Sequence, residues 1–95
     1  METVSVIGGG SFGTVIANIV AGNGYRVNFW LRNEESATEV NEKRENSRYL
    51  PGYQIHENVY ATTDIQAAVE SSSVVFVAVP SAFFRTVVQR LAPII

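Results

Sequence analysis

Cysteine is absent from the 95-residue sequence, so disulfide bonds and thiolate metal sites are excluded and a reducing compartment is permitted. Basic residues are few, seven against nine acidic ones, and the formal net charge is −2. This balance indicates that neither nucleic acid nor an anionic membrane is a partner. The longest apolar run, Val74 to Val79, is too short to span a bilayer, and Glu2 does not fit a signal peptide. We therefore expect a cytoplasmic protein without a membrane span.

What the sequence does contain is typical of a globular protein. Apolar residues make up 46% of it and charged residues 17%, and the length fits one domain covering residues 1–95. Its apolar pattern alternates between short runs and helical spacing. The short runs predict strands at 3–7, 26–31, 59–62 and 73–79. The helical spacing predicts helices at 12–22, 34–45, 63–70 and after Pro80-Ser81.

Local signals mark several ends of these elements. Asn33 is a candidate N-cap of the second helix, and Thr63 with Gln66 matches a capping box at the start of the third. The run at 73–79 is almost wholly apolar, which is typical of a parallel strand covered on both faces. Ser81 is either the N-cap of the last helix or a contact near the ligand.

The alternation of strands and helices predicts an α/β protein with a Rossmann-type, doubly wound parallel sheet. Right-handed crossovers give the strand order 3-2-1-4 and place ligands beyond the carboxyl ends of the first and fourth strands. Because the sequence stops at Ile95, we expect the sheet to be incomplete at its C-terminal end.

A glycine motif joins the first strand to the first helix. Residues 8–13 read GGGSFG, a G-x-G-x-x-G in the strand–turn–helix context that this motif requires. Gly8 would form the tight turn, Gly10 would admit a pyrophosphate, and Gly13 would let the helix pack closely on the strand. Backbone N–H groups near Ser11 and Phe12 would bind the anion at the helix start. The alternative is a glycine-rich turn without a ligand.

Arg32 stands where a cofactor with a free ribose 2′-hydroxyl usually meets an acidic residue. A guanidinium binds a 2′-phosphate, so NADP or NAD is expected as cofactor, with NADPH favoured. Two alternatives remain: Arg32 is simply exposed, or Glu34 or Glu35 takes the role of the acid. Phe83 would line the nicotinamide end of the cofactor or belong to the core.

Other polar residues carry no chemical assignment. His56 is the sole histidine and has no partner in its polar loop, and no cluster of metal ligands is present. The five acids between 34 and 45 are interpreted as a solvated helix face.

Five stretches occur in the order GGGSFGT, FWLR, ENSRYLPG, ATTD and VAVPS. Together they resemble the N-terminal region of bacterial NAD(P)-dependent glycerol-3-phosphate dehydrogenase. The resemblance covers nearly the whole chain, and RYLPG is much more specific than the glycine turn. It implies cofactor contacts at Ser11, Phe12, Arg32 and Tyr49, although Tyr49 would equally serve as a loop anchor over the core.

The resemblance also implies an activity. The family interconverts dihydroxyacetone phosphate and sn-glycerol 3-phosphate, a glycerophospholipid precursor, by moving hydride between the nicotinamide and C2 of the substrate; a homodimer is expected. The catalytic lysines of the family lie beyond Ile95, mostly in a helical C-terminal domain, and Lys43 matches none of them. We therefore assign no catalytic residue, and expect a fragment that binds cofactor weakly at best and is inactive alone.

Three other interpretations stay open. The first is the cofactor domain of another dehydrogenase with this N-terminal fold, of the 3-hydroxyacyl-CoA or ketopantoate type, which RYLPG disfavours. The second is a module that senses dinucleotides without redox chemistry. The third is a fold fragment that binds no ligand.

Overall fold

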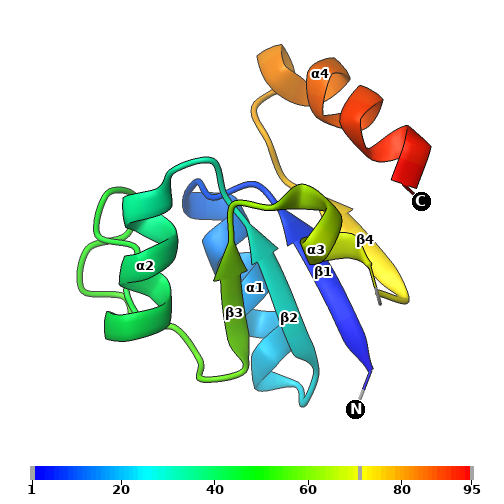
Figure 1. The fold of residues 1–95 in the computed structure, drawn as a ribbon. Helices are drawn as coiled ribbons and strands as arrows, with labels where there is room; N and C mark the ends of the chain where they lie inside the picture. Colours follow the sequence, from blue (N-terminus) through cyan, green and yellow to red (C-terminus); the bar gives the residue numbers. More distant parts are fainter. Residues whose placement is uncertain (1, 71, 95) are drawn as a thin grey trace.

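The computed structural model describes residues 2–70 and 72–94, which form a four-stranded sheet with helices on both faces (Figure 1). The strands are β1 (Thr3–Ile7), β2 (Arg26–Trp30), β3 (Val59–Thr62) and β4 (Val74–Val77). The helices are α1 (Ser11–Gly22), α2 (Glu34–Lys43), α3 (Ile65–Val69) and α4 (Ser81–Leu91), followed by a 3-10 turn at Ala92–Ile94. Every predicted element is present, and its ends differ from the prediction by at most two residues.

The strand order is β3-β2-β1-β4 and all pairs are parallel, which confirms the predicted α/β topology. Parallel pairing brings the carboxyl ends of the strands to one edge of the sheet. The Gly8 amide donates to the Trp30 carbonyl at 2.9 Å, and the Ala78 amide donates to the Ile7 carbonyl at 2.7 Å. The three segments that follow β1, β2 and β4 therefore meet at this edge.

Alternation along the strands builds two cores. Val6 and Phe29 are buried with residues of α1 and α2 on one face, whereas Ile7 and Trp30 are buried with residues of α3 and α4 on the other. Because side chains alternate across a strand, the two central strands β1 and β2 supply both cores, whereas β3 supplies the first and β4 the second. The ends of β1 and β2 are therefore held between the helices on the two faces of the sheet.

The predicted covering of β4 on both faces was wrong. Val75 and Val77 pack against the second core, but Val74 is 46% exposed and Phe76 is 41% exposed. The cause is position: β4 lies at one end of the strand order, whereas α1 packs mainly on β1 and β2. The apolar run therefore predicted the strand correctly but did not predict how far neighbouring elements bury it.

Helix caps agree with the prediction at α2 and differ at α3 and α4. The Asn33 side chain accepts a hydrogen bond from the Ser36 amide at 3.0 Å, as expected. The capping box was wrong, because Asp64 caps α3 by accepting from the amides of Gln66 and Ala67, both at 3.1 Å. At α4 Ser81 is the first helical residue and Pro80 occupies the N-cap position, with no side-chain hydrogen bond.

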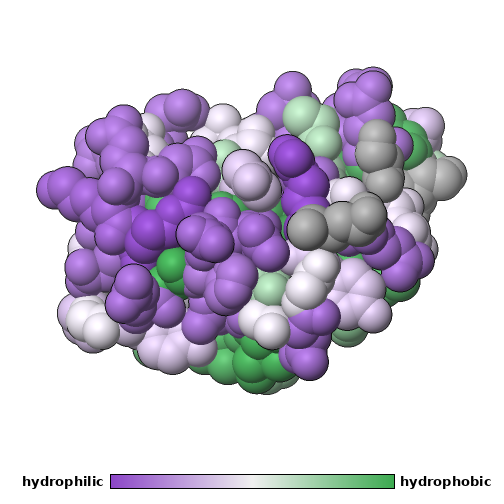
Figure 2. Space-filling view, turned by 90° about the horizontal axis from the view of Figure 1, so that it is seen from below, coloured by the Kyte–Doolittle hydropathy of each residue, from purple (hydrophilic) through white to green (hydrophobic). Residues whose placement is uncertain are grey.

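The end of the molecule where the strands begin is mostly hydrophilic, with a hydrophobic region at one margin (Figure 2). No helix within the described ranges has the length and apolar character that crossing a membrane requires.

Candidate functional site

The glycine turn is shaped by close contacts at Gly8 and Gly13. Gly8 has φ +128°, a conformation that favours glycine, and a Cβ there would lie 2.1 Å from the Ala78 carbonyl oxygen. A Cβ at Gly13 would lie 1.9 Å from the Gly8 carbonyl oxygen. The tight turn predicted at Gly8 and the close helix packing predicted at Gly13 are thus confirmed. A Cβ on Gly9, for which we predicted no role, would lie 2.4 Å from the Leu31 Cβ and clash with it.

Gly10 differs from its neighbours, because a Cβ built on it meets nothing within 4 Å. Its backbone is extended, with φ −79° and ψ −171°, a conformation open to any residue. The fold therefore does not require glycine here. Gly10 lines the cavity described below, and the open space beside it leaves its backbone accessible to an approaching group.

Helix α1 begins at this turn with its first amides free. Gly10 is the N-cap and provides no side-chain acceptor, and the first turn of α1 contains no acidic residue. The N–H groups of Ser11 and Phe12 have no partner inside the helix, and the helix dipole makes this end favourable for an anion. The Phe12 ring is 70% exposed beside them, and the Ser11 hydroxyl donates to the Tyr49 carbonyl at 3.2 Å.

A cavity of about 360 Å³ lies at the carboxyl edge of the sheet. Six segments line it: the glycine turn, the end of β2, the start of α2, the loop after α2, the β4–α4 connection and α4. Of the predicted site residues it brings together Gly8, Gly10, Arg32 and Tyr49. Ser11, Phe12 and Gly13 follow directly on the turn but are not in its wall. The position agrees with the expected switch point of the sheet.

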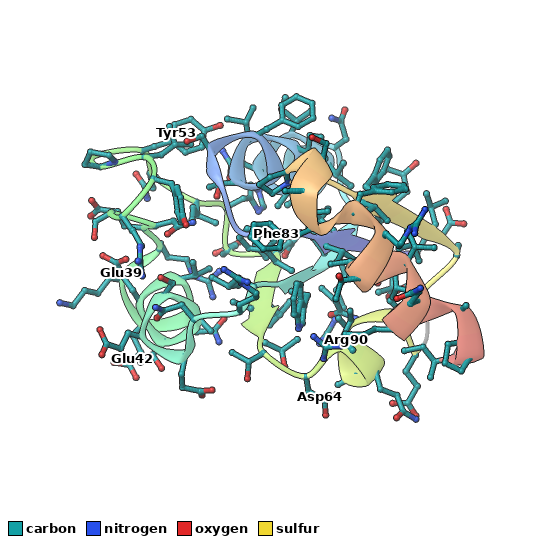
Figure 3. The ribbon with its side chains drawn as sticks, turned by 90° about the horizontal axis from the view of Figure 1, so that it is seen from above. Glu39, Glu42, Tyr53, Asp64, Phe83 and Arg90 are labelled. Atoms are coloured by element: carbon teal, nitrogen blue, oxygen red, sulfur yellow. The ribbon has the colours of Figure 1, made fainter. Side chains whose placement is uncertain are left out.

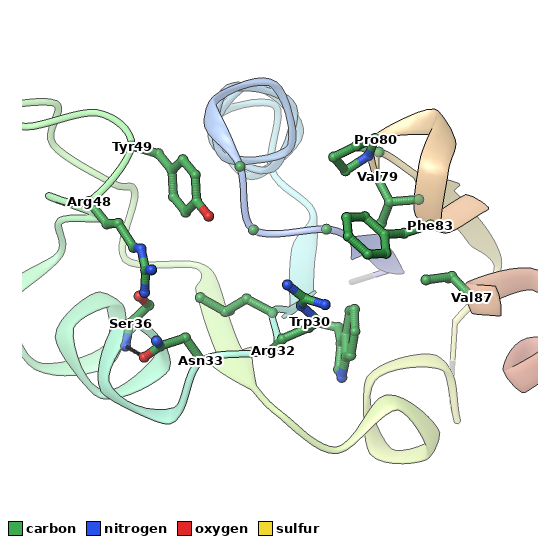
Figure 4. Close-up of a pocket in the computed structure, with 15 residues that line it drawn as sticks. Trp30, Arg32, Asn33, Ser36, Arg48, Tyr49, Val79, Pro80, Phe83 and Val87 are labelled. Atoms are coloured by element: carbon green, nitrogen blue, oxygen red, sulfur yellow. Dashed lines mark hydrogen bonds between the residues drawn. The ribbon is translucent and has the colours of Figure 1, made fainter. Parts of the chain in front are cut away.

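Two guanidinium groups face this cavity. The Arg32 guanidinium carbon lies 4.9 Å from the centre of the Phe83 ring, and Arg48 reaches toward Ser36 on α2 (Figure 4). Within the described part of the chain, no Asp or Glu lines the cavity. Glu34 instead accepts a hydrogen bond from the Thr63 hydroxyl at 2.9 Å. The wall therefore carries positive charge, which suits phosphate groups.

Both aromatic residues left open by the sequence belong to the cavity wall rather than the core. Phe83 is 46% exposed and points from α4 toward the centre of this edge, whereas Glu39 and Glu42 point outward from α2 (Figure 3). Tyr49 is 48% exposed and its ring points into the cavity (Figure 4). The interpretation of Tyr49 as an anchor over the core was wrong.

Two acidic residues hold the loop that presents Arg48 and Tyr49, although we interpreted them from the sequence as part of a solvated helix face. Glu39 accepts from the Ser47 amide at 3.0 Å, and Glu45 accepts from the Gly52 amide at 2.9 Å. Hydrogen bonds from Ser47 lower the pKa of Glu39, so this tie is present near neutral pH and is lost as the pH falls through that pKa.

Two contributors were missed by sequence reasoning, Arg48 and Asn46. Arg48 adjoins Tyr49, and that neighbour was the available signal. Asn46 is fully buried beneath the glycine turn. Nothing in the polar sequence around it indicates this burial. His56 lies outside the cavity wall, where its Nδ1 accepts from the Asn58 amide at 3.0 Å.

Comparisons with known proteins agree with this geometry. A family model described as NAD-dependent glycerol-3-phosphate dehydrogenase N-terminus matches residues 3–95. The glycerol-3-phosphate dehydrogenase, NAD(P)+ type, of Teredinibacter turnerae is 49% identical over 90 residues, which are 95% of this chain and 26% of that protein. The chain thus spans about a quarter of the length of such relatives.

Solved structures give the same result. Glycerol-3-phosphate dehydrogenase from Coxiella burnetii superposes with a TM-score of 0.91 at 32% identity, over 99% of this chain and 29% of that one. The Saccharomyces cerevisiae protein gives a TM-score of 0.93 at 27% identity, over 99% and 30%. With the glycine turn, the cavity and a match over nearly all its residues, this chain belongs to the family of N-terminal domains of NAD-dependent glycerol-3-phosphate dehydrogenases.

Proposed function

We propose that this chain binds NAD(P)H in the cavity, with the pyrophosphate on the amides at the start of α1. The observation that carries the proposal is the open space at Gly10. It lies beside N–H groups that have no partner within α1, in a wall to which the described residues contribute no Asp or Glu. Gly10 would admit the pyrophosphate, Gly8 and Gly13 would fix the turn, and Ser11 and Phe12 would supply N–H groups. Arg32 and Tyr49 would contact the rest of the cofactor.

We further propose that the protein containing this chain interconverts dihydroxyacetone phosphate and sn-glycerol 3-phosphate, for glycerophospholipid synthesis. When bound, the nicotinamide exchanges hydride with C2 of the substrate. This chain would bind and orient the cofactor as its dinucleotide-binding domain, and other parts of the protein would supply the catalytic groups. Family membership and the names of the relatives support this proposal.

Reduction of dihydroxyacetone phosphate by the complete protein tests this activity. We expect loss of NADPH absorbance that depends on dihydroxyacetone phosphate, and none with 3-oxoacyl-CoA or ketopantoate. Oxidation of NADPH with either alternative substrate alone would move the protein to another dehydrogenase family. Binding of NADPH without oxidation in any assay would favour a sensing module instead.

Arg32 is proposed to favour NADPH over NADH. Arg32→Ala should weaken NADPH binding by about one to two orders of magnitude, because it removes a charged hydrogen bond of roughly 1.5–3 kcal/mol. The affinity for NADH, which lacks the 2′-phosphate, should fall much less. Calorimetry measures both affinities. Arg26→Ala is the control, since Arg26 stacks on Tyr60 away from the cavity. Equal losses for both cofactors would reject the role.

Two further proposals rest on the family resemblance alone. We propose a homodimer, which the molar mass in solution measured by light scattering would test. A cytoplasmic location is proposed with it, and fractionation of cells producing the complete protein would test that.

A further inference from the structure

Asn46 closes the turn that presents part of the cavity wall. It is fully buried, whereas Ser47 and Arg48 beside it are exposed. Its backbone carbonyl accepts hydrogen bonds from the amides of Tyr49 and Leu50, at 3.1 and 2.8 Å. These bonds fold residues 46–50 back on themselves, and so carry Arg48 and Tyr49 to the cavity.

The Asn46 side chain holds the glycine turn. Its Nδ2 donates to the Gly9 carbonyl at 2.9 Å and to the Thr14 hydroxyl at 3.0 Å. The Thr14 hydroxyl in turn donates to the Gly10 carbonyl at 2.8 Å. Two consecutive carbonyls of the turn are therefore held. Asn46 holds the Gly9 carbonyl directly, and the Thr14 hydroxyl holds the Gly10 carbonyl together with the Thr14 amide, which donates to it at 3.0 Å.

Fixing these carbonyls also fixes two amides. In a trans peptide the C=O and the following N–H point in opposite directions. The orientation of the Gly9 carbonyl therefore sets the Gly10 N–H, and that of the Gly10 carbonyl sets the Ser11 N–H. Both N–H groups point away from Asn46 and Thr14. The Ser11 N–H is one of the two that the proposed function assigns to the pyrophosphate, and the Gly10 N–H directly precedes it.

The hydrogen-bonding capacity of the Asn46 amide is only half satisfied. The Oδ1 atom of Asn46 is buried and accepts no hydrogen bond from the described residues. A buried acceptor without a donor costs free energy. The two bonds donated by Nδ2 are the physical reason that remains for this side chain.

We propose that Asn46 is a positioning residue for the cofactor pyrophosphate. It couples the RYLPG loop to the glycine turn, so that the Gly10 and Ser11 amides are oriented before the ligand arrives. The inference rests on the proposed function of the cavity. Preorganised donors bind more tightly than donors that must be ordered on binding.

Asn46→Asp tests the proposal in the complete protein. Aspartate keeps the shape and the backbone carbonyl but has no side-chain N–H to donate. We expect the Kd for NADPH and for NADH to rise alike, by about 10- to 100-fold, because the two cofactors share the pyrophosphate. Isothermal titration calorimetry gives both constants, and the melting temperature of the free protein is measured beside them.

Asn41→Asp is the matched control. Asn41 joins α2 to β3 through two hydrogen bonds with Ala61, both 2.9 Å, outside the cavity wall. This variant should lower the melting temperature without changing either Kd. A loss of affinity in Asn41→Asp equal to that in Asn46→Asp would assign the effect to stability and overturn the proposal.

A pair of Thr14 variants covers the case in which Asn46→Asp does not fold. Thr14→Ser keeps the hydroxyl and should bind both cofactors as the unchanged protein does. Thr14→Val keeps the buried shape without the hydroxyl and should lose affinity for both. An unchanged Kd in folded Asn46→Asp or in Thr14→Val overturns the positioning role while the proposed function stands. If the unchanged protein binds neither cofactor, the proposed function itself fails.

Discussion

Replacing Gly10 by valine should weaken NADPH binding roughly 100-fold while leaving the fold intact. The branched side chain would occupy the free space beside the turn and hold the pyrophosphate off the amides of Ser11 and Phe12. One or two charge-assisted hydrogen bonds, at about 1.5–3 kcal/mol each, would be lost. Calorimetry with NADPH and NADH measures this, and both cofactors should be affected.

The stability of Gly10→Val separates this effect from unfolding. The backbone at Gly10 is extended, so valine is tolerated there. Valine lowers the conformational entropy of the unfolded chain, and this stabilisation offsets the loss from a poorer N-cap to within about 1 kcal/mol. Gly22→Val is the control, because Gly22 also has open space around it but lies at the far end of α1. Unchanged NADPH affinity in Gly10→Val would remove the main support for the cofactor site.

Gly13→Ala should have the opposite profile, a large loss of stability. Its Cβ would lie 1.9 Å from the Gly8 carbonyl oxygen, and α1 would have to move away from the turn by more than about 1 Å. Overpacking of this kind costs about 3 kcal/mol, or roughly 10 °C or more in the Tm of a domain this size. Differential scanning calorimetry measures the shift.

Gly22→Ala is the control for the backbone effect of Gly13→Ala. Both glycines lie in α1, but alanine at Gly22 meets nothing within 4 Å and should be neutral or slightly stabilising. A Tm of Gly13→Ala within a degree or two of the unchanged protein would show that the helix yields at this contact. The two variants of the turn thus distinguish a glycine that the fold needs from one that the ligand needs.

Sequence alone predicted the fold because its signals are local or general. Strands and helices follow from the periodicity of apolar residues, and the strand order follows from the handedness of crossovers. The capping box failed because two acceptors compete at adjacent positions. Thr63 matched the pattern, but in the fold its hydroxyl donates to Glu34 and Asp64 caps the helix.

The candidate site was predictable only in its local part. The glycine turn lies within six consecutive residues, and the structural consequences of Gly8 and Gly13 follow from strand–turn–helix geometry. Asn46 was not predictable, because its bonds join residues 37 and 32 positions apart in the sequence. Arg48 reaches the cavity through the same long-range packing, which the periodicity of apolar residues does not predict.

Trp30 is the sole tryptophan of the chain and lies in the cavity wall, 3% exposed. Its indole N–H donates to the Thr63 carbonyl at 2.8 Å, and the Arg90 guanidinium carbon lies 5.4 Å from its ring centre. Apart from the contribution of tyrosines, the intrinsic fluorescence of this domain therefore comes from one indole at its ligand-facing edge. Emission spectra consequently report on that edge without any attached label.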